Sequence, residues 1–400
     1  MKTVGIVVEY NPFHNGHLYH AQKAREAADA DVVIAVMSGH FLQRGEPALM
    51  NKWARTRMAL LNGVDLVVEL PYAFSAQKAD VFGYGAISTL NALGCHAFCF
   101  GSENGKLAPF LDAYYHLQES AHLLNAPIQH YMKRGYSFPR AQALAREALF
   151  TDEWTLDLSQ PNNILGFHYI QANERIGSPM TPLTIKRQQA GYHDDQLTEG
   201  DITSATSIRK ALAQDQGSYT AIQKYVPSSV IAEMQDYYRK YHTFHTWEMY
   251  WPQLQYRLLT DALPALQEIY EVAEGIEYRL KEASRQAASF SEFMHQVKTK
   301  RYTWTRIQRM LVHLLTNTTK AEMEKAAESV QYIRLLGMNR IGQEYIRSIK
   351  KKLSIPLISR TAAYKELLAL DVKATEVYLQ GLRIPSLLDS EFKQPPILWP

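Results

Sequence analysis

Two histidines near the N-terminus, His14 and His17, have a spacing that suits phosphate chemistry. Asn15 and Gly16 separate them, and they stand between an apolar run at residues 3–9 and a segment with helical periodicity. The free N–H groups at a helix start favour a phosphate, and a glycine lets the backbone approach it closely. Imidazoles placed there can stabilise negative charge during displacement at the α-phosphorus of ATP. The pattern predicts that His14 and His17 are catalytic, acting by positioning and charge stabilisation without a covalent enzyme intermediate.

A second segment has residue types that suit the rest of a triphosphate. Residues 204–209 read Ser-Ala-Thr-Ser-Ile-Arg and precede a helical pattern. At a helix N-terminus, Ser204 and Thr206 suit the β- and γ-phosphates, and Arg209 can pair with the departing pyrophosphate. Such Ser/Thr runs often only cap helices, so the segment gains its weight from the histidine pair.

The elements that must position these residues alternate between strands and helices. We expect strands at residues 3–9, 31–37, 64–70, 96–100 and 182–188, and helices at residues 16–28, 52–61, 77–93 and 164–176. This alternation predicts an α/β fold with a doubly wound parallel sheet. Ligands of such sheets bind at the carboxyl ends of the strands, which is where the histidines and the 204–209 segment belong.

The rest of the chain reads mainly as helix. Residues 107–150 form a polar helical flank, and nearly everything from residue 228 onward has helical periodicity. Apolar runs at 330–336 and 355–358 surround a helical stretch at 340–352, which predicts a small βαβ unit within a mostly helical C-terminal domain. We therefore expect one domain over residues 1–225 and a second over residues 226–400.

Composition places the chain among ordinary globular proteins, with 46% hydrophobic and 21% charged residues. The apolar runs are too short to span a bilayer, and no signal-peptide pattern opens the chain. Cys95 and Cys99 are the two cysteines. Their spacing suits neither a zinc site nor a disulfide, so we expect reduced thiols, a cytoplasmic protein and no membrane partner.

Positive charge is concentrated in one part of the chain. Residues 296–352 hold 13 Lys and Arg against 4 Asp and Glu, or +9, so the remainder carries about −6 of the net +3. A basic segment on a mildly acidic body suggests a polyanion. Aromatic residues Tyr302 and Trp304 stand among the basic ones and can stack on unpaired bases. The candidate RNA-contacting residues are Lys300, Arg301, Arg306, Arg309, Arg347, Lys350 and Lys351.

The motifs resemble a known superfamily. His-x-Gly-His after the first strand and a Ser/Thr-rich turn ending in Ile-Arg are both marks of the HIGH-type nucleotidyltransferases. Further stretches narrow the resemblance to the bacterial tRNA(Met) cytidine acetate ligase family, over essentially the whole chain. These stretches are residues 11–17, 37–39, 43–47, 63–71, 100–103, 161–166, 300–302 and 306–309. The chain departs from relatives at His168, where they often have glutamate, and at His40, which we leave out of the catalytic set.

The resemblance implies a Rossmann-like nucleotidyltransferase domain and a two-step reaction. Acetate attacks the α-phosphate of ATP, giving acetyl-adenylate and pyrophosphate. The exocyclic amine of the wobble cytidine in elongator tRNA(Met) then takes the acetyl group, giving N4-acetylcytidine. Magnesium is expected with the ATP phosphates, without an identifiable ligand set.

The resemblance also implies ATP-binding residues beyond the two motifs. Asn162 would read the adenine or ribose, Gly101 would let the nucleotide pack on bare backbone, and Arg187 would neutralise phosphate. From the residues alone, Asn162 is as easily a helix N-cap and Arg187 a solvated strand end. With Ser204, Thr206 and Arg209, the implied set is Val7, Val8, Glu9, Tyr10, Asn11, Pro12, Phe13, His14, Asn15, Gly16, His17, Leu18, Tyr19, His20, Gly101, Asn162, Arg187 and Gln188.

Other interpretations stay open at this level. The histidines can simply cap a helix, or can belong to a zinc site that lacks an evident third ligand. The chain can be an adenylyltransferase for a small phosphorylated metabolite, although the basic C-terminal part speaks against it. It can also be a non-catalytic RNA-binding protein, although the intact motifs speak against that. Acetate leaves no linear signature and rests on the resemblance.

Overall fold

The computed structural model spans 400 residues and describes residues 1–149, 156–188, 197, 200–214 and 219–400. Within these, one sheet has the strand order β5-β4-β1-β2-β3-β6-β7, with β8 beside β6. Its strands are β1 (Thr3–Val8), β2 (Val32–Ser38), β3 (Leu66–Leu70), β4 (Ala97–Ser102), β5 (Thr181–Lys186), β6 (Ile333–Met338), β7 (Leu357–Ile358) and β8 (Ile397–Leu398). Neighbouring strands from β5 to β3 are parallel, which confirms the predicted α/β class.

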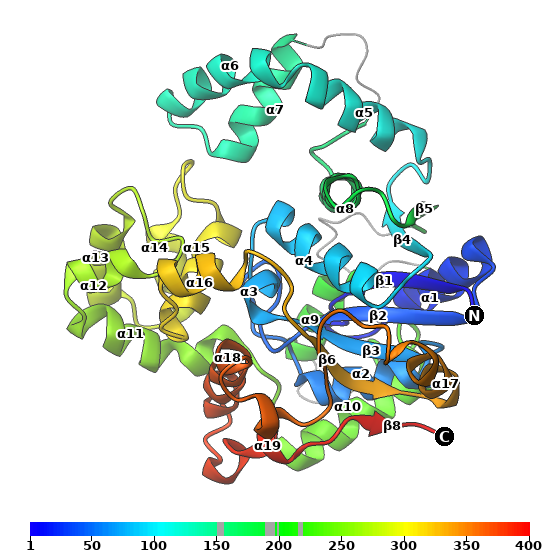
Figure 1. The fold of residues 1–400 in the computed structure, drawn as a ribbon. Coiled ribbons are helices and arrows are strands. Elements are labelled where there is room, and N and C mark those ends of the chain that lie inside the picture. The colour runs from blue at the N-terminus through cyan, green and yellow to red at the C-terminus, as the bar shows by residue number, and fades with distance from the viewer. Residues whose placement is uncertain (150–155, 189–196, 198–199, 215–218) are drawn as a thin grey trace.

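Helices cover both faces of the sheet (Figure 1). One buried cluster takes side chains from α1 (Asn15–Ala28), α2 (Lys52–Leu61), α9 (Ala205–Gln214) and α10 (Ser228–Tyr241). The other takes them from α4 (Ala79–Ala92), α8 (Pro161–Arg175) and α17 (Arg340–Ile349). Strands enclosed on both faces are continuous apolar runs, and every residue of β2 is buried.

The predicted βαβ unit is present as β6, α17 and β7, and its strands extend the central sheet. β6 pairs antiparallel with β3, which brings Arg334 opposite Glu69. Arg334 and Lys52 both contact the buried carboxylate of Glu391, at 3.5 and 2.9 Å. These charges are out of water, so they depend on one another for compensation. The C-terminal part thus supplies strands as well as helices, and a domain border at residue 225 stays a prediction.

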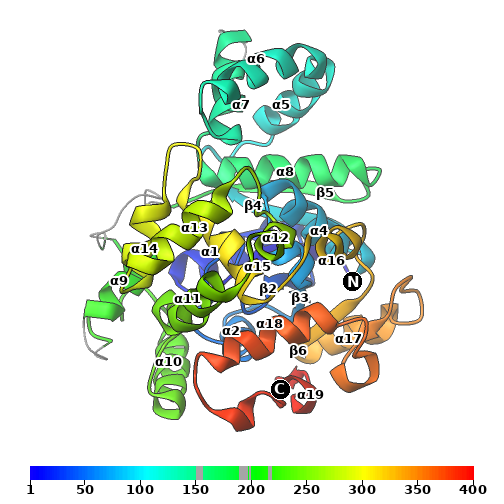
Figure 2. The same ribbon diagram turned by 90° about the vertical axis from the view of Figure 1, so that its left-hand side faces the viewer.

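Two further groups of helices flank this core (Figures 1 and 2). A lobe beside α8 contains α5 (Ala108–Glu119), α6 (Ala121–Lys133) and α7 (Phe138–Leu149), around its own small apolar cluster. A helical layer contains α11 (Trp251–Thr260), α12 (Leu263–Glu268), α13 (Ile276–Gln286), α14 (Phe290–Val297), α15 (Trp304–Leu315) and α16 (Lys320–Ala326). Near the C-terminus lie α18 (Ala369–Gln380) and α19 (Ser390–Lys393), and short 3-10 turns occur at Trp247–Tyr250, Thr361–Tyr364 and Pro385–Leu387.

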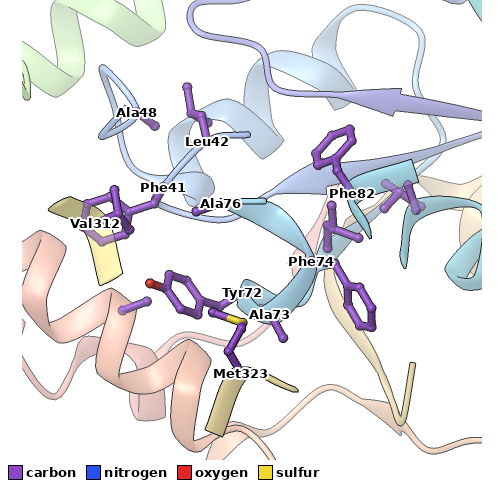
Figure 3. Close-up of a cluster of buried hydrophobic side chains, with 14 of the residues drawn as sticks. Phe41, Leu42, Ala48, Tyr72, Ala73, Phe74, Ala76, Phe82, Val312 and Met323 are labelled. Atoms are coloured by element: carbon purple, nitrogen blue, oxygen red, sulfur yellow. The ribbon is translucent and has the colours of Figure 1, made fainter. Parts of the chain in front are cut away.

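The helical layer is joined to the sheet by an apolar contact around α3 (Tyr72–Ser75). Phe41, from the loop after β2, and Tyr72 lie in one buried cluster with Val312 of α15 and Met323 of α16 (Figure 3). The Tyr72 hydroxyl lies 3.0 Å from Nδ1 of His313 in α15. The layer is therefore packed against the loops that leave the carboxyl ends of β2 and β3.

Candidate active site

A cleft lies at the carboxyl ends of β1, β4 and β5. β1 has β4 on one side and β2 on the other, so the chain path reverses here, which is where open α/β sheets bind ligands. Most residues of the predicted ATP set line this cleft: Val7, Val8, Glu9, Tyr10, Asn11, His14, Gly16, His17, Tyr19, His20, Gly101, Asn162, Arg187, Gln188, Ser204, Thr206 and Arg209.

The two motif histidines stack on each other at the start of α1, with ring centroids 3.7 Å apart. Nδ1 of His14 accepts a hydrogen bond from the Gly16 N–H at 3.0 Å, and Nδ1 of His17 accepts one from the His14 N–H at 3.2 Å. An imidazole nitrogen that accepts an N–H carries no proton, so each neutral ring is protonated at Nε2. Both rings therefore use Nδ1 at the helix start and carry an Nε2–H donor, and both residues line the cleft.

Burial keeps these imidazoles uncharged. It lowers the pKa of His14 to about 3, and lowers that of His17 well below its ordinary value. His20, in the second turn of α1, lines the same cleft, and burial lowers its pKa to about 4. The nearby guanidinium of Arg187 acts in the same direction on all three rings. The cleft thus contains neutral N–H donors beside a permanent positive charge.

The turn between β1 and α1 is shaped by Tyr10 and Asn15. Tyr10 has a φ of +52°, a left-handed conformation that costs a non-glycine residue about 1 kcal/mol or more. Its buried ring packs on Phe13 and His17, with centroid distances of 4.7 and 5.0 Å. The Asn15 amide donates to the carbonyls of Asp201 and Lys224, both at 2.9 Å. These contacts hold the histidines in place and tie α1 to the segments that precede α9 and α10.

Four residues of the predicted ATP set do not line the cleft, and they stabilise this turn instead. Pro12 and Phe13 are buried beneath it, Asn15 makes the hydrogen bonds just described, and Leu18 packs against the cluster on the α1 face. They support the turn between β1 and α1 from behind, because successive side chains cannot all face one cleft.

The 204–209 segment meets the histidine loop from the opposite wall. Ser204 Oγ accepts the Ser207 N–H at 3.0 Å just before α9, so the predicted helix start is present. Arg209 donates from Nη1 to the Asn11 carbonyl at 2.9 Å, and its Nη2 lies 3.1 Å from Glu46 Oε2. The N-termini of α1 and α9 therefore converge on one cleft, an arrangement that suits a run of phosphates.

The β4 and β5 side of the cleft is suited to a nucleoside. A side chain on Gly101 would meet Cγ of Arg187 at 3.2 Å, so the bare backbone keeps this wall open. Arg187 donates to Oδ1 of Asn162 at 2.8 Å, and Asn162 donates to Glu103 Oε1 at 2.7 Å. Asn162 is the second residue of α8 and Gln160 is its N-cap, so Asn162 is not the cap.

A sequence profile of the family described as HIGH Nucleotidyl Transferase matches residues 1–390. The chain belongs to this family. It is 49% identical to the tRNA(Met) cytidine acetate ligase of Bacillus subtilis (strain 168) over 397 residues, covering 98% of this chain and 95% of that protein. It is 47% identical to the protein of the same name from Lysinibacillus sphaericus (strain C3-41), covering 99% of this chain and all of that one. The narrower resemblance is confirmed as well.

Solved structures agree over the full length. The crystal structure of apo Thermotoga maritima TmcAL superimposes with a TM-score of 0.93 at 33% identity, covering 100% of this chain and 99% of that one. The structure of the same protein bound with alpha-thio ATP has a TM-score of 0.91 at 32% identity, with the same coverage. The fold is thus that of a HIGH nucleotidyltransferase. The similar Thermotoga maritima protein binds an ATP analogue.

Several other residues of the cleft were not predicted from the sequence. They are Gln43, Arg44, Glu46, Phe82, Phe100, Pro161, Leu165, Tyr169, Ile185, Ile202, Thr203 and Ala205. The family stretches 43–47, 100–103 and 161–166 were a signal for some of them. Phe82 and Tyr169 reach the cleft from the packed helices α4 and α8, and no linear spacing marks them.

The first group of predicted RNA contacts lies around the start of α15. Lys300 is exposed, and Arg301 and Arg306 share Glu274 Oε2 at 3.0 and 3.4 Å. Arg309 differs, because its side chain is only 11% exposed and pairs with Glu271 at 2.9 Å. Contact with RNA stays a prediction for all four, and the geometry of Arg309 suits a structural task.

The aromatic residues of this segment are mostly covered. Tyr302 is 7% exposed, and its hydroxyl donates to the Glu274 carbonyl at 2.9 Å. Trp304 is half-buried with its ring against His295. Stacking on a base therefore requires the exposed part of Trp304 rather than Tyr302.

The second basic group lies near the amino ends of the strands, opposite the end that carries the cleft. Arg347, Lys350 and Lys351 are exposed on and just after α17. The Tyr345 hydroxyl in the same helix donates to the carbonyl of Leu93, ahead of β4, at 2.6 Å. The two basic groups are thus separated by at least the strand length, about 20 Å for six residues.

Three further observations bound the chemistry. Among the described residues, no group of three or more His, Cys, Asp or Glu side chains is arranged to hold a metal ion. Cys95 and Cys99 are buried free thiols, and burial raises the pKa of each to about 12. Within the described part of the chain, the helices are too short or too polar to cross a bilayer.

Proposed function

We propose that this protein is a tRNA(Met) cytidine acetate ligase that works through acetyl-adenylate. The observation that carries the proposal is that His14 and His17, each with Nδ1 accepting a backbone N–H, line a cleft where α1 and α9 converge. The names of the full-length relatives support the acceptor, and the alpha-thio ATP complex of the Thermotoga maritima protein supports the nucleotide.

In the first step an oxygen of acetate attacks the α-phosphorus of ATP, and the bond to pyrophosphate breaks. His14 and His17 donate from Nε2 to the α-phosphate oxygens as charge develops there. Their rings are already fixed by backbone hydrogen bonds, so the donors need no reorganisation at the transition state. Arg209 and the N-terminus of α9 receive the β- and γ-phosphates, and the Arg187 and Asn162 pair holds the nucleoside side.

In the second step the exocyclic amine of the wobble cytidine takes the acetyl group and AMP departs. We assign anticodon-arm contacts to Lys300, Arg301 and Arg306, because they lie on the helical layer that packs beside the cleft. A single-stranded loop can present a splayed base to such a site. Magnesium enters as part of its ATP complex, with phosphate oxygens as the main ligands. Since ATP and tRNA are cytoplasmic molecules, we propose a cytoplasmic enzyme.

The proposal is tested by incubating the protein with ATP, labelled acetate and elongator tRNA(Met). We expect label in N4-acetylcytidine after nuclease digestion, with AMP and pyrophosphate formed in proportion. The matched control is the same tRNA with uridine at the wobble position, which should take no label. AMP transfer to a small phosphorylated acceptor would favour a metabolite adenylyltransferase. Absence of ATP turnover under all conditions would favour a non-catalytic RNA-binding protein.

A further inference from the structure

The wall of the cleft on the α4 and α8 side is aromatic and has no assigned task. Phe82 of α4 and Tyr169 of α8 both line the cleft, and they are only 2% and 6% exposed. The two helices cross closely beside them, because a side chain on Gly83 would come to 3.1 Å from the His168 carbonyl oxygen. The ring of Phe100 in β4 packs on Tyr169 with centroids 6.1 Å apart. Two buried rings therefore reach the cleft from one rigid helix crossing.

This wall and the two helix N-termini belong to opposite faces of the sheet. Side chains of α1 and α9 belong to the buried cluster on one face, whereas Phe82 and Tyr169 belong to the cluster on the other. The proposed function places the triphosphate at the N-termini of α1 and α9. At the carboxyl ends of the strands, the phosphates therefore enter from one face, and the two rings approach from the other.

The geometry of phosphoryl chemistry connects the two faces. Displacement at phosphorus places the attacking and leaving oxygens roughly in line with it. In the proposed first step, pyrophosphate leaves toward Arg209 and the N-terminus of α9. The acetate oxygen must then approach the α-phosphorus from the opposite direction, which is the side of α4 and α8. The methyl group lies farther from phosphorus than the attacking oxygen, so it reaches the wall of Phe82 and Tyr169.

One face of α8 separates this wall from the nucleoside. Asn162, Leu165 and Tyr169 all line the cleft, and their spacing of three and four residues places them on the same side of the helix. Asn162 accepts the hydrogen bond of Arg187 at the nucleoside end. Tyr169 lies seven residues farther along, or about 10 Å at the rise of an α-helix. A nucleoside held at Asn162 therefore leaves the Tyr169 end of the cleft to another group.

We propose that Phe82 and Tyr169 form the subsite for the acyl group and restrict the carboxylate substrate to two carbons; the inference rests on the proposed function. The rings enclose the methyl group of acetate, and an added methylene would collide with side chains that close packing keeps in place. The Tyr169 hydroxyl donates a hydrogen bond to the acetate oxygen that does not attack phosphorus. Neither residue makes or breaks a bond; together they select and orient the carboxylate.

The Tyr169 hydroxyl is available for this contact. Within the described part of the chain it makes no hydrogen bond, although the side chain is buried. A polar group left unpaired in the interior is costly, and an acyl oxygen would satisfy it. Burial and the carboxylate of Glu9 both raise the pKa of this phenol, so it stays a proton donor. The guanidinium groups of Arg44 and Arg55 lie near Glu9 and offset its charge, so a second carboxylate can enter.

The first test compares acetate with propionate in carboxylate-dependent exchange of pyrophosphate into ATP, measured without tRNA. The unmodified protein should prefer acetate. Phe82→Leu should raise the ratio of kcat/KM for propionate to that for acetate by about 10-fold, the scale of one methylene in an apolar pocket. With elongator tRNA(Met) present, the variant should also form N4-propionylcytidine, detected by mass spectrometry after nuclease digestion. Because both carboxylates are compared on the same variant, a lower folded fraction does not change the ratio.

The matched control is Phe167→Leu. Phe167 lies in α8 and is 6% exposed, but it does not line the cleft. Its replacement removes the same ring from the same packed core, so it should lower stability without changing the ratio of propionate to acetate. Thermal unfolding of both variants shows whether each is folded at the assay temperature.

Tyr169→Phe tests the hydroxyl without changing the size of the ring. The KM for acetate should rise by about 10-fold, the scale of one hydrogen bond, and the KM for ATP by much less. The ratio of propionate to acetate should stay the same, because both carboxylates lose the same contact. A merely structural role would not divide the measurements in this way.

Several results would overturn the inference while leaving the proposed function intact. They are equal use of propionate and acetate by the unmodified protein, an unchanged ratio in folded Phe82→Leu, and an equal change of the ratio in Phe167→Leu. An unchanged KM for acetate in Tyr169→Phe overturns the hydrogen bond to the acyl oxygen. Absence of exchange with acetate and propionate alike in the unmodified protein instead refutes the proposed function, and the inference with it.

Discussion

Acidification should destabilise this protein through histidines that are buried uncharged. Burial lowers the pKa of His14 and His245 to about 3 and that of His313 to about 4. Between the unfolded value near 6.5 and these folded values, the unfolded chain binds protons that the folded chain does not. Stability is therefore fully present above about pH 6.5 and is lost progressively as the pH falls toward the folded values.

The size of the loss follows from the pKa differences. Lowering the pH from 7.5 to 5.5 costs each of these histidines between about 1 and 2 kcal/mol, or roughly 4 kcal/mol for the three. Burial raises the pKa of Glu69, so this carboxyl takes up a proton in the folded state and offsets part of the loss. His17 and His40, whose pKa values are also lowered, add to it. We expect a net loss of at least about 2 kcal/mol, a substantial fraction of the stability of a folded protein.

Urea unfolding followed by circular dichroism at the two pH values measures this loss. His245 offers an internal check, because its Nδ1 lies 2.6 Å from the Tyr250 hydroxyl and it is remote from the nucleotide loop. His245→Asn can keep this hydrogen bond without titrating, so its loss between pH 7.5 and 5.5 should be about 1 kcal/mol smaller than that of the unmodified protein. A stability that is constant or rises on acidification would refute the reasoning. So would a His245→Asn variant with an unchanged pH response.

Three other predictions concern the site and its support. His14→Ala and His17→Ala should each slow acetate-dependent ATP–pyrophosphate exchange by about 100-fold, and a rate within about threefold would remove that ring from the mechanism. Gly45→Ala should lower stability by about 2–4 kcal/mol in thermal unfolding, since it adds both left-handed strain and a backbone clash; an unchanged midpoint would contradict this. Arg306→Ala should weaken tRNA binding and reduce its salt slope by about 1, whereas Arg309→Ala should mainly lower stability by leaving Glu271 buried and unpaired; the opposite assignment would reverse our interpretation of α15.

The central sheet and the helix start that carries His14 and His17 could be predicted because their signals are local. Strands buried on both faces appear as continuous Val and Ile runs, and His14 and His17 stand at a turn that the alternation of elements already places. The pairing of β6 with β3 could not be predicted, since it joins residues some 270 positions apart by an antiparallel ladder with no local signature. The lobe of α5, α6 and α7 was expected only as helical sequence, without its separate apolar cluster.

The contacts that each side chain makes could not be predicted either. Arg306 and Arg309 share a basic helix pattern, yet one is partly exposed and the other is held by Glu271 in the interior. The difference depends on which acidic side chain of a distant loop reaches each guanidinium. Tyr169 and Phe82 line the cleft for a similar reason, because the packing of α4 on α8 decides which way they face.

The same imidazole atoms explain why the motif needs both of its histidines at this spacing. Nδ1 of His17 receives the N–H of residue 14, and Nδ1 of His14 receives that of Gly16, so each ring satisfies a backbone donor that the helix start leaves open. That use of Nδ1 leaves the proton of each neutral ring on Nε2, and both residues line the cleft. Helix capping and the proposed charge stabilisation are thus compatible interpretations of the pair. The cap sets the tautomer, and under the proposed function this tautomer offers the nucleotide two hydrogen-bond donors.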